Sequence, residues 1–405
     1  MVDIRPILEH ELDAFVDLMD VAYLQDSTKE RRDHYRTINE LDRSFGAFDG
    51  DQLVGTISAY SFDLTVPGER TVPMGGTTVV AVRPTHRRRG ILRGMIDIHL
   101  DDVRCRAEPL AGLWASEATI YGRFGFGCAI DFVTFEIRSD ATTITGPIDE
   151  RVQVRMVDKV EFAEAAQRFY DSIRLSRPGE LTRTPAWWKA RRLAQSSFGG
   201  SGMSSHRYAL AERDNQLVGY LHYRTKDVVR DGVPRGEVHV AELLGLDADV
   251  ELAFWRFLFA IDLTTAVRAP FRSMDDPLLH RLDNRRAVKT LVSDGVYLRF
   301  MDVTKALEGR TYSVPGTLTI EVTDHPDLRG TYRLEVKGDG TACCSRADGA
   351  VDVSLDSRTL AACYLGGCRV CAMARAGRVA GSAASIRLAD LMFDNQYLPI
   401  AREIF

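Results

Sequence analysis

The chain has 405 residues, 45% of them hydrophobic and 27% charged, and a formal net charge of −5 at pH 7. This length and composition predict a globular protein of two or three domains, and the negative charge argues against a general nucleic-acid binder. The sequence has no run of about eighteen apolar residues, and its N-terminal residues lack the apolar stretch of a signal peptide. We therefore expect a cytoplasmic protein with no membrane partner.

The first third of the chain reads as short strands and helices in alternation. Apolar residues at helical spacing predict two helices, and β-branched runs broken by turn residues predict the strands. Ser27 to Glu30 reads as a capping box that opens the second helix. The expected elements are a strand at 2–5, helices at 9–24 and 27–38, strands at 45–48, 52–66, 72–82 and 110–116, a short helix within 117–127, and a final strand at 129–138.

A basic turn between a strand and a helix, within Val79 to Leu100, is the most informative stretch. The strand must stop before Pro84, Thr85 is the expected N-cap, and His86 to Gly90 form the turn. Arginines and a glycine at a helix N-terminus attract an anion such as a pyrophosphate. The stretch has neither a P-loop nor a G-x-G-x-x-G fingerprint. The alternative is a solvated basic turn.

The middle third repeats part of this pattern. Phe48 to Gly55 and Glu212 to Gly219 are similar hairpins, and a strand at 237–246 precedes a helix at 249–264. No Arg-Arg-x-Gly turn joins that strand to that helix, so we interpret the second copy as degenerate. Trp187 and Trp188 are interpreted as packing residues, with a substrate wall as the alternative.

The last third reads as strands, turns and a late helix at 387–396, and it resembles a sterol-carrier-type α+β domain. The chain has seven cysteines, including a C-x-x-C pair at Cys368 and Cys371. A zinc site is the alternative interpretation of these cysteines. Because no histidine lies nearby in the sequence, we predict free thiols and no metal.

Three segments together resemble the Eis (enhanced intracellular survival) family of GNAT N-acetyltransferases. They are Leu64 to Gly68, Val80 to Arg93 and Ala115 to Gly125. The resemblance implies an α/β (α+β) protein with two tandem GNAT folds followed by a sterol-carrier-protein-like domain. The implied boundaries are 1–146 for the catalytic copy, 147–298 for the degenerate copy and 299–405 for the C-terminal domain.

The same resemblance implies an acetyl-CoA-dependent N-acetyltransferase that acts on small polycationic amines such as aminoglycosides and assembles as a homohexamer. Tyr121 would be the general acid that protonates the CoA thiolate, and the α-carboxylate of Phe405 the general base. Leu92 departs from the small residue of the general GNAT pattern but fits this family. The implied acetyl-CoA contacts are Val80, Ala81, Val82, Arg88, Arg89, Gly90, Ile91, Leu92, Arg93, Ser116 and Glu117.

The acceptor side is less well defined by the sequence. Four acidic residues near the first two helices could line an amine pocket with Tyr35, although a solvated helix face is the preferred interpretation of each one alone: Asp20, Asp26, Glu30 and Asp33. Ile404 separates Glu403 from the terminal phenylalanine, where some relatives carry a carboxylate. Two other functions remain open, a protein-lysine acetyltransferase and a non-catalytic acyl-CoA or lipid-binding protein.

Overall fold

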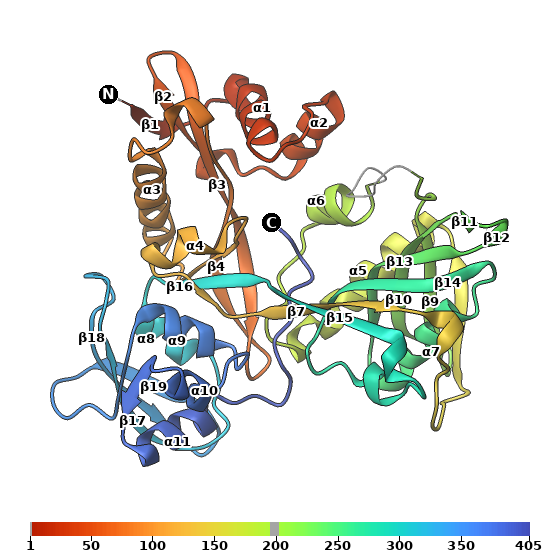
Figure 1. The fold of residues 1–405 in the computed structure, drawn as a ribbon. Helices are drawn as coiled ribbons and strands as arrows, with labels where there is room; N and C mark the ends of the chain where they lie inside the picture. The colour runs from red at the N-terminus through yellow and green to blue at the C-terminus, as the bar shows by residue number, and fades with distance from the viewer. Residues whose placement is uncertain (1, 195–201) are drawn as a thin grey trace.

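The computed structural model describes residues 2–194 and 202–405 (Figure 1). Within them the strands form two seven-stranded sheets, a five-stranded sheet and a two-stranded ribbon. The first sheet has the order β1-β2-β3-β4-β5-β16-β6, and α3 packs against its strands β2 to β5. Its elements are β1 (Asp3–Pro6), α1 (Leu12–Ala22), α2 (Lys29–Ile38), β2 (Phe45–Asp49), β3 (Gln52–Val66), β4 (Arg70–Val82), α3 (Ile91–Cys105), β5 (Leu110–Trp114), α4 (Ala118–Tyr121), β6 (Gly127–Cys128) and β16 (Val296–Phe300).

The second sheet has the order β15-β7-β14-β13-β10-β9-β8 and carries α5 and α7. The hairpin predicted to repeat that of the first sheet is present as β9 and β10. The elements of this sheet and its helices are β7 (Asp131–Ile137), β8 (Val152–Val157), α5 (Lys159–Ile173), α6 (Pro185–Trp187), β9 (Arg207–Arg213), β10 (Gln216–Lys226), β13 (Gly236–Gly245), α7 (Ala248–Phe259), β14 (Thr264–Arg272) and β15 (Val288–Asp294). The separate two-stranded ribbon consists of β11 (Val229–Arg230) and β12 (Val233–Pro234).

The two sheets exchange strands. The segment predicted to complete the first sheet, residues 129–138, forms β7 and pairs with β14 and β15 in the second sheet. In return β16 pairs with β5 and β6 in the first. The predicted place of 129–138 was therefore wrong, because alternation in a sequence identifies a strand but not its partner. Each sheet is completed by a strand from the other region of the chain.

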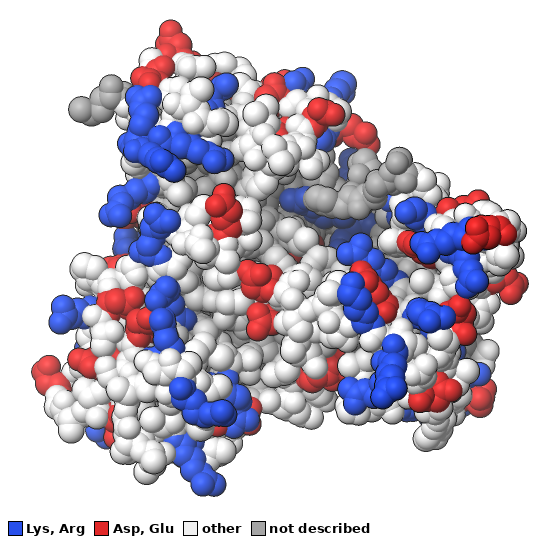
Figure 2. Space-filling model, viewed as in Figure 1, with Lys and Arg blue, Asp and Glu red and all other residues white. Residues whose placement is uncertain are grey.

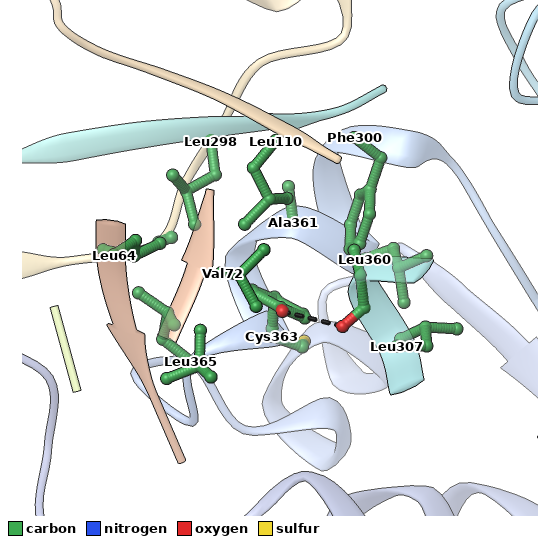
Figure 3. Close-up of a cluster of buried hydrophobic side chains, with 14 of the residues drawn as sticks. Leu64, Val72, Leu110, Leu298, Phe300, Leu307, Leu360, Ala361, Cys363 and Leu365 are labelled. Atoms are coloured by element: carbon green, nitrogen blue, oxygen red, sulfur yellow. Dashed lines mark hydrogen bonds between the residues drawn. The ribbon is translucent and has the colours of Figure 1, made fainter. Parts of the chain in front are cut away.

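The C-terminal domain shares a hydrophobic core with the first sheet. Leu64, Val72 and Leu110 of β3, β4 and β5 face Leu360 and other residues of the last domain (Figure 3). Within the domain, the hydroxyl of Tyr364 in α9 donates a hydrogen bond of 2.8 Å to the carbonyl of Ala306 in α8. The domain consists of α8 (Val303–Gly309), β17 (Gly316–Val322), β18 (Gly330–Val336), β19 (Ala342–Arg346), β20 (Val353–Leu355), α9 (Ser357–Tyr364), α10 (Val370–Arg375), β21 (Val379–Gly381) and α11 (Ala383–Phe393).

Several helix boundaries differ from the sequence predictions; the helix predicted at 9–24 is α1 (Leu12–Ala22), and the late helix predicted at 387–396 is α11 (Ala383–Phe393). The N-cap of α2 is Thr28, whose hydroxyl accepts from Arg31 N at 3.2 Å, so Ser27 does not open a capping box. The helix predicted at 249–264 ends at Phe259, and Leu263 adopts a left-handed backbone before β14 begins. Thr85 lies in a 3₁₀ turn with its hydroxyl against His86 Nδ1 and is not the cap of α3.

Two kinds of feature are missing from residues 2–194 and 202–405. No helix there has the length and apolar character needed to cross a bilayer. No group of three or more His, Cys, Asp or Glu side chains is placed to hold a metal ion.

Candidate active site

Strands β4 and β5 separate to form a fork in the first sheet. They pair in parallel from Met74–Leu110 to Thr77–Leu113, but β4 continues to Val82 alongside β3 only. A bulge accompanies the separation, where Val79 adopts a left-handed backbone (φ +54°). The buried Thr56 hydroxyl donates a hydrogen bond of 2.8 Å to the Val79 carbonyl, so this carbonyl has a partner at the bulge. On the side facing β5, no described strand pairs with residues 80–82, so an extended amide-containing ligand could pair there. The Val80 carbonyl accepts a hydrogen bond of 3.4 Å from the Tyr23 hydroxyl.

The basic turn next to the fork ends at an uncapped helix N-terminus. Gly90 is the N-cap of α3 with φ +81° and offers no side-chain cap. The first hydrogen bond of the helix runs from Gly94 N to Gly90 O at 3.1 Å, so the amides of Ile91 to Arg93 precede the bonded ladder. Free amides, the positive end of the helix dipole and the arginines of the turn together suit an anionic ligand such as a pyrophosphate.

A cavity of about 560 Å³ joins the fork to this helix end. Of the sequence-predicted contacts, only Arg89 lies outside it; Arg89 binds Asp49 on the β2–β3 turn at 3.0 Å. Sequence reasoning did not assign Tyr23 and Arg123, which line the cavity without belonging to the recognised strand-turn-helix motif. The lining consists of Ala22, Tyr23, Val80, Ala81, Val82, His86, Arg87, Arg88, Gly90, Ile91, Leu92, Arg93, Ser116, Glu117, Ile120, Tyr121, Arg123 and Phe124.

Tyr121 closes one end of the cavity. It is the last residue of α4, it is 4% exposed, and its ring packs edge-on against Phe126. Burial raises the pKa of the Tyr121 phenol well above its usual value, and the neighbouring Tyr23 and Glu117 raise it further. The hydroxyl is therefore protonated at neutral pH and is available as a proton donor.

The C-terminal tail is bound by the central region and ends near the fork (Figure 1). Ile400 N donates to Pro178 O at 2.8 Å, and Arg402 forms an ion pair with Glu180. Trp114, the last residue of β5, donates from its indole Nε1 to the carbonyl of residue 403 at 2.7 Å. These contacts fix the path of a segment that could have been a frayed terminus.

Glu403 anchors this tail with its side chain. It is 2% exposed, it forms ion pairs with Arg183 and, at 2.9 Å, with Arg192, and it accepts from Trp187 Nε1 at 2.7 Å. All of these partners belong to the central region. Its carboxylate is therefore neutralised inside the protein and is not offered to a substrate.

Phe405 rests on the sheet immediately before the fork. Its ring lies 5.1 Å from that of Phe62, and Trp187 packs edge-on against Phe62 at 5.3 Å. A Cβ added to Gly76 would lie 2.6 Å from Phe62 Cε2 and 3.2 Å from Phe405 Cδ2, so glycine leaves room for both rings. Gly76 precedes Thr77, the last residue of β4 that pairs with β5. The terminal residue thus reaches the point where the strands separate.

The other residues expected on the acceptor side have different environments. Asp20 is fully buried and pairs with Arg31 at 2.6 Å, and Asp33 pairs with Lys29 and Arg36. Asp26 and Glu30 are exposed. Tyr35 packs in the cluster of α1 residues and edge-on against its neighbour His34. Trp187 and Trp188 are both buried, as the packing interpretation predicted.

The second copy has a fork but a different helix end. β13 and β14 pair only from Gly236 to His239, and β13 then continues to Gly245. The N-terminus of α7 is capped by Asp247, whose carboxylate accepts from the amides of Asp249 and Val250. A carboxylate already occupies the place that an anion would take, which supports the interpretation of this copy as degenerate.

If this helix end binds the pyrophosphate of CoA, as the family resemblance implies, Gly90→Ala should weaken CoA binding several-fold. The added methyl meets no atom within 4 Å, so the cost is the left-handed backbone, about 1–2 kcal/mol, which is relieved by rotating the helix-end amides. Calorimetric titration with CoA measures the effect. Gly232→Ala is the matched control, because its φ of +75° and open surroundings are alike but it lies in the β11–β12 turn. Equal affinity of Gly90→Ala and wild type would contradict the assignment.

Glu403→Gln is expected to loosen the tail and lower kcat about tenfold, because it leaves Arg183 and Arg192 with fewer compensating charges in a buried site. Carboxypeptidase digestion should release the last residues faster, and kcat should fall in parallel. Glu164→Gln, which removes an exposed partner of Arg168, is the control. Unchanged digestion would show that Glu403 does not hold the tail.

Comparison with known proteins matches this architecture. Models described as acetyltransferase (GNAT) domains match residues 3–129 and 179–300, and a sterol carrier protein domain matches 303–401. An N-acetyltransferase of Streptomyces avermitilis is 38% identical over 353 residues, 86% of each chain. N-acetyltransferase Eis of Mycobacterium tuberculosis is 33% identical over 347 residues, 82% of this chain and 81% of the relative. The crystal structure of Eis1 from Mycobacterium abscessus aligns over 100% of both chains with a TM-score of 0.85 and 30% identity. The predicted fold class is thus confirmed.

Proposed function

Because the chain belongs to the Eis family of N-acetyltransferases, we propose that it transfers acetyl from acetyl-CoA to a primary amine at the fork between β4 and β5. The observation that carries this proposal is the single cavity that joins the open strand edge, the uncapped helix and Tyr121. The backbone of Val80 to Val82 would bind the pantetheine amides, and the α3 amides with Arg88 and Arg93 the pyrophosphate. Ser116 and Glu117 would line the opposite wall.

The chain's own residues divide the proton transfers. The α-carboxylate of Phe405 attracts the acceptor ammonium and helps its proton to leave toward water, which frees the nitrogen lone pair. The nitrogen then bonds to the acetyl carbonyl carbon while the carbon–sulfur bond breaks. Tyr121 gives its phenolic proton to the departing sulfur. The proton lost from the new amide nitrogen returns to the tyrosinate through water, so the protons balance.

Direct transfer without an acetylated protein agrees with the surroundings of the thiols. No cysteine lines the described cavity, and burial raises the pKa of Cys128 and of Cys344 to about 12. These two thiols are protonated at neutral pH and are poor nucleophiles. The cavity therefore serves to bring the amine to the acetyl group.

The identity of the amine is a further part of the proposal. Since relatives of this chain are named Eis, the first candidate is a small polycationic acceptor such as an aminoglycoside, acetylated at several positions. A protein-lysine acceptor is the second, and a non-catalytic acyl-CoA-binding protein the third. A homohexamer in the cytoplasm remains a prediction from the family resemblance.

A thiol-release assay with acetyl-CoA tests the function. The acceptor panel contains several aminoglycosides, a polyamine, simple alkylamines and a lysine peptide, and product masses show where acetyl is placed. We expect release that depends on the amine and equals the N-acetyl product. Binding of CoA without release for every amine would overturn acetyl transfer and favour the binding protein.

A further inference from the structure

Arg191 carries a positive charge that no described carboxylate neutralises. It lies in the π-helical turn Trp188–Arg192, half-buried, and its Nε has no hydrogen-bond partner within residues 2–194 and 202–405. The adjacent residues 195–201 have the sequence QSSFGGS and contain no acidic residue. Its neighbour Arg192, by contrast, pairs with Glu242 and Glu403. A guanidinium that is partly withdrawn from water and lacks a counter-ion is a ready site for an anion.

Arg191 and the terminal residue lie around the same aromatic cluster. The guanidinium carbon is 5.3 Å from the Trp187 ring, Trp187 packs edge-on against Phe62, and Phe62 contacts Phe405. Arg191, Trp187, Phe62 and Phe405 thus form a continuous row of contacts that links the guanidinium to the end of the tail. Figure 2 shows Lys and Arg side chains in the hollow between α2 and the α6 segment.

The groups that face Arg191 do not reverse this charge. His34 of α2 is held neutral, because burial, together with the charges of Arg191 and Arg31, lowers its pKa to about 4. Burial raises the pKa of Tyr60 on β3, and the charge of Arg191 opposes that rise. The Glu40 carboxylate accepts hydrogen bonds from the backbone N–H of Ser61 at 2.7 Å and from its hydroxyl at 2.6 Å. The acidic side chains Asp20, Asp33 and Glu403 are all ion-paired.

We propose that the acceptor is a primary amine that also bears an anionic group, a carboxylate or a phosphate, and that Arg191 binds this group. The inference rests on the proposed function, since it assigns the acceptor end of the same site. Arg191 sets the distance between the anionic group and the reacting nitrogen, and an all-cationic acceptor would be repelled by it. This acceptor class is an alternative to the aminoglycoside-like candidate given above, and a comparison of anionic and cationic amines distinguishes the two.

Three amines of equal chain length test the proposal: 6-aminohexanoate, hexylamine and 1,6-diaminohexane. In wild type we expect kcat/KM for 6-aminohexanoate to exceed that for the diamine about tenfold, the size of one charge-assisted hydrogen bond. Arg191→Gln should bring this ratio close to one, mainly through KM, and Arg191→Lys should restore part of it. Lys189→Gln, which removes an exposed charge from the same turn, should keep the wild-type ratio. CoA affinity of each variant reports whether it is folded.

The outcomes separate the two proposals. If hexylamine is acetylated but the diamine is equal to or better than 6-aminohexanoate, the assignment of Arg191 is wrong and acetyl transfer stands. A preference for 6-aminohexanoate that survives in Arg191→Gln also overturns it. If none of the three amines releases CoA thiol while another amine of the panel above does, the assignment of Arg191 is wrong and acetyl transfer stands; if CoA binds and no amine of either set gives release, acetyl transfer to amines itself fails.

Discussion

Tyr121→Phe is expected to lower kcat about a hundredfold or more, the usual contribution of a positioned general acid. The substitution removes only the hydroxyl, and the buried ring keeps its contact with Phe126. CoA affinity should therefore change little, and the loss should lie in kcat. Steady-state kinetics together with calorimetric titration of CoA measure both quantities.

The pH profile adds a second readout for Tyr121. Because burial raises the pKa of the phenol, the acid stays protonated through the alkaline range. We expect kcat/KM to rise with pH as the acceptor ammonium loses its proton, with no fall near pH 10 from ionisation of the tyrosine. Tyr208→Phe is the matched control, because Tyr208 is equally buried and lies outside the cavity. A Tyr121→Phe enzyme as fast as this control would remove Tyr121 from the mechanism.

Displacing the terminal carboxylate is the second change with a large expected effect. Adding one glycine after Phe405 moves the charge away from the ring that Gly76 and Phe62 hold in place. We expect kcat/KM at pH 7 to fall about a hundredfold, as for loss of a general base. The deficit should shrink toward pH 10, where the acceptor is already unprotonated. The measurement is kcat/KM against pH for the extended and natural chains.

Ile404→Ser is the control for the tail experiment, because Ile404 is 43% exposed whereas residues 400–403 and Phe405 are buried. A tail extension without effect at pH 7, in a protein whose CoA affinity is intact, would show that another group accepts the proton. Activity that is lost equally at pH 7 and pH 10 would instead indicate a structural role of the terminus.

The sequence located most of the cavity lining because the signal of the strand-turn-helix motif is local, and CoA binding there stays a prediction. Strand, turn and helix N-terminus from Val80 to Arg93 are contiguous, and Gly90 and the arginines reveal the anion site directly. Arg89 was the exception in this motif, because its partner Asp49 lies forty residues earlier. The cavity residues of this motif could thus be located from their neighbours in the chain, whereas Tyr23 and Arg123 could not.

The acceptor side depends on contacts between distant segments, which no local pattern encodes. Glu403 could be noted in the sequence, but its burial against Arg183 and Arg192 required the fold. Asp20 was a candidate for the amine pocket, but its ion pair with Arg31 on α2 could not be predicted from the sequence. The exchange of β7 and β16 was missed for the same reason, since strand pairing is a long-range property.

A single-turnover experiment tests the central claim most directly. Protein loaded with acetyl-CoA is mixed rapidly with an amine and quenched, and free CoA, N-acetylated amine and protein mass are measured in each sample. Direct transfer at the fork predicts that CoA and acetylated amine form together in equal amounts while the protein mass stays unchanged. Acetyl found on the protein before product forms, or CoA released without an acetylated amine, would contradict it.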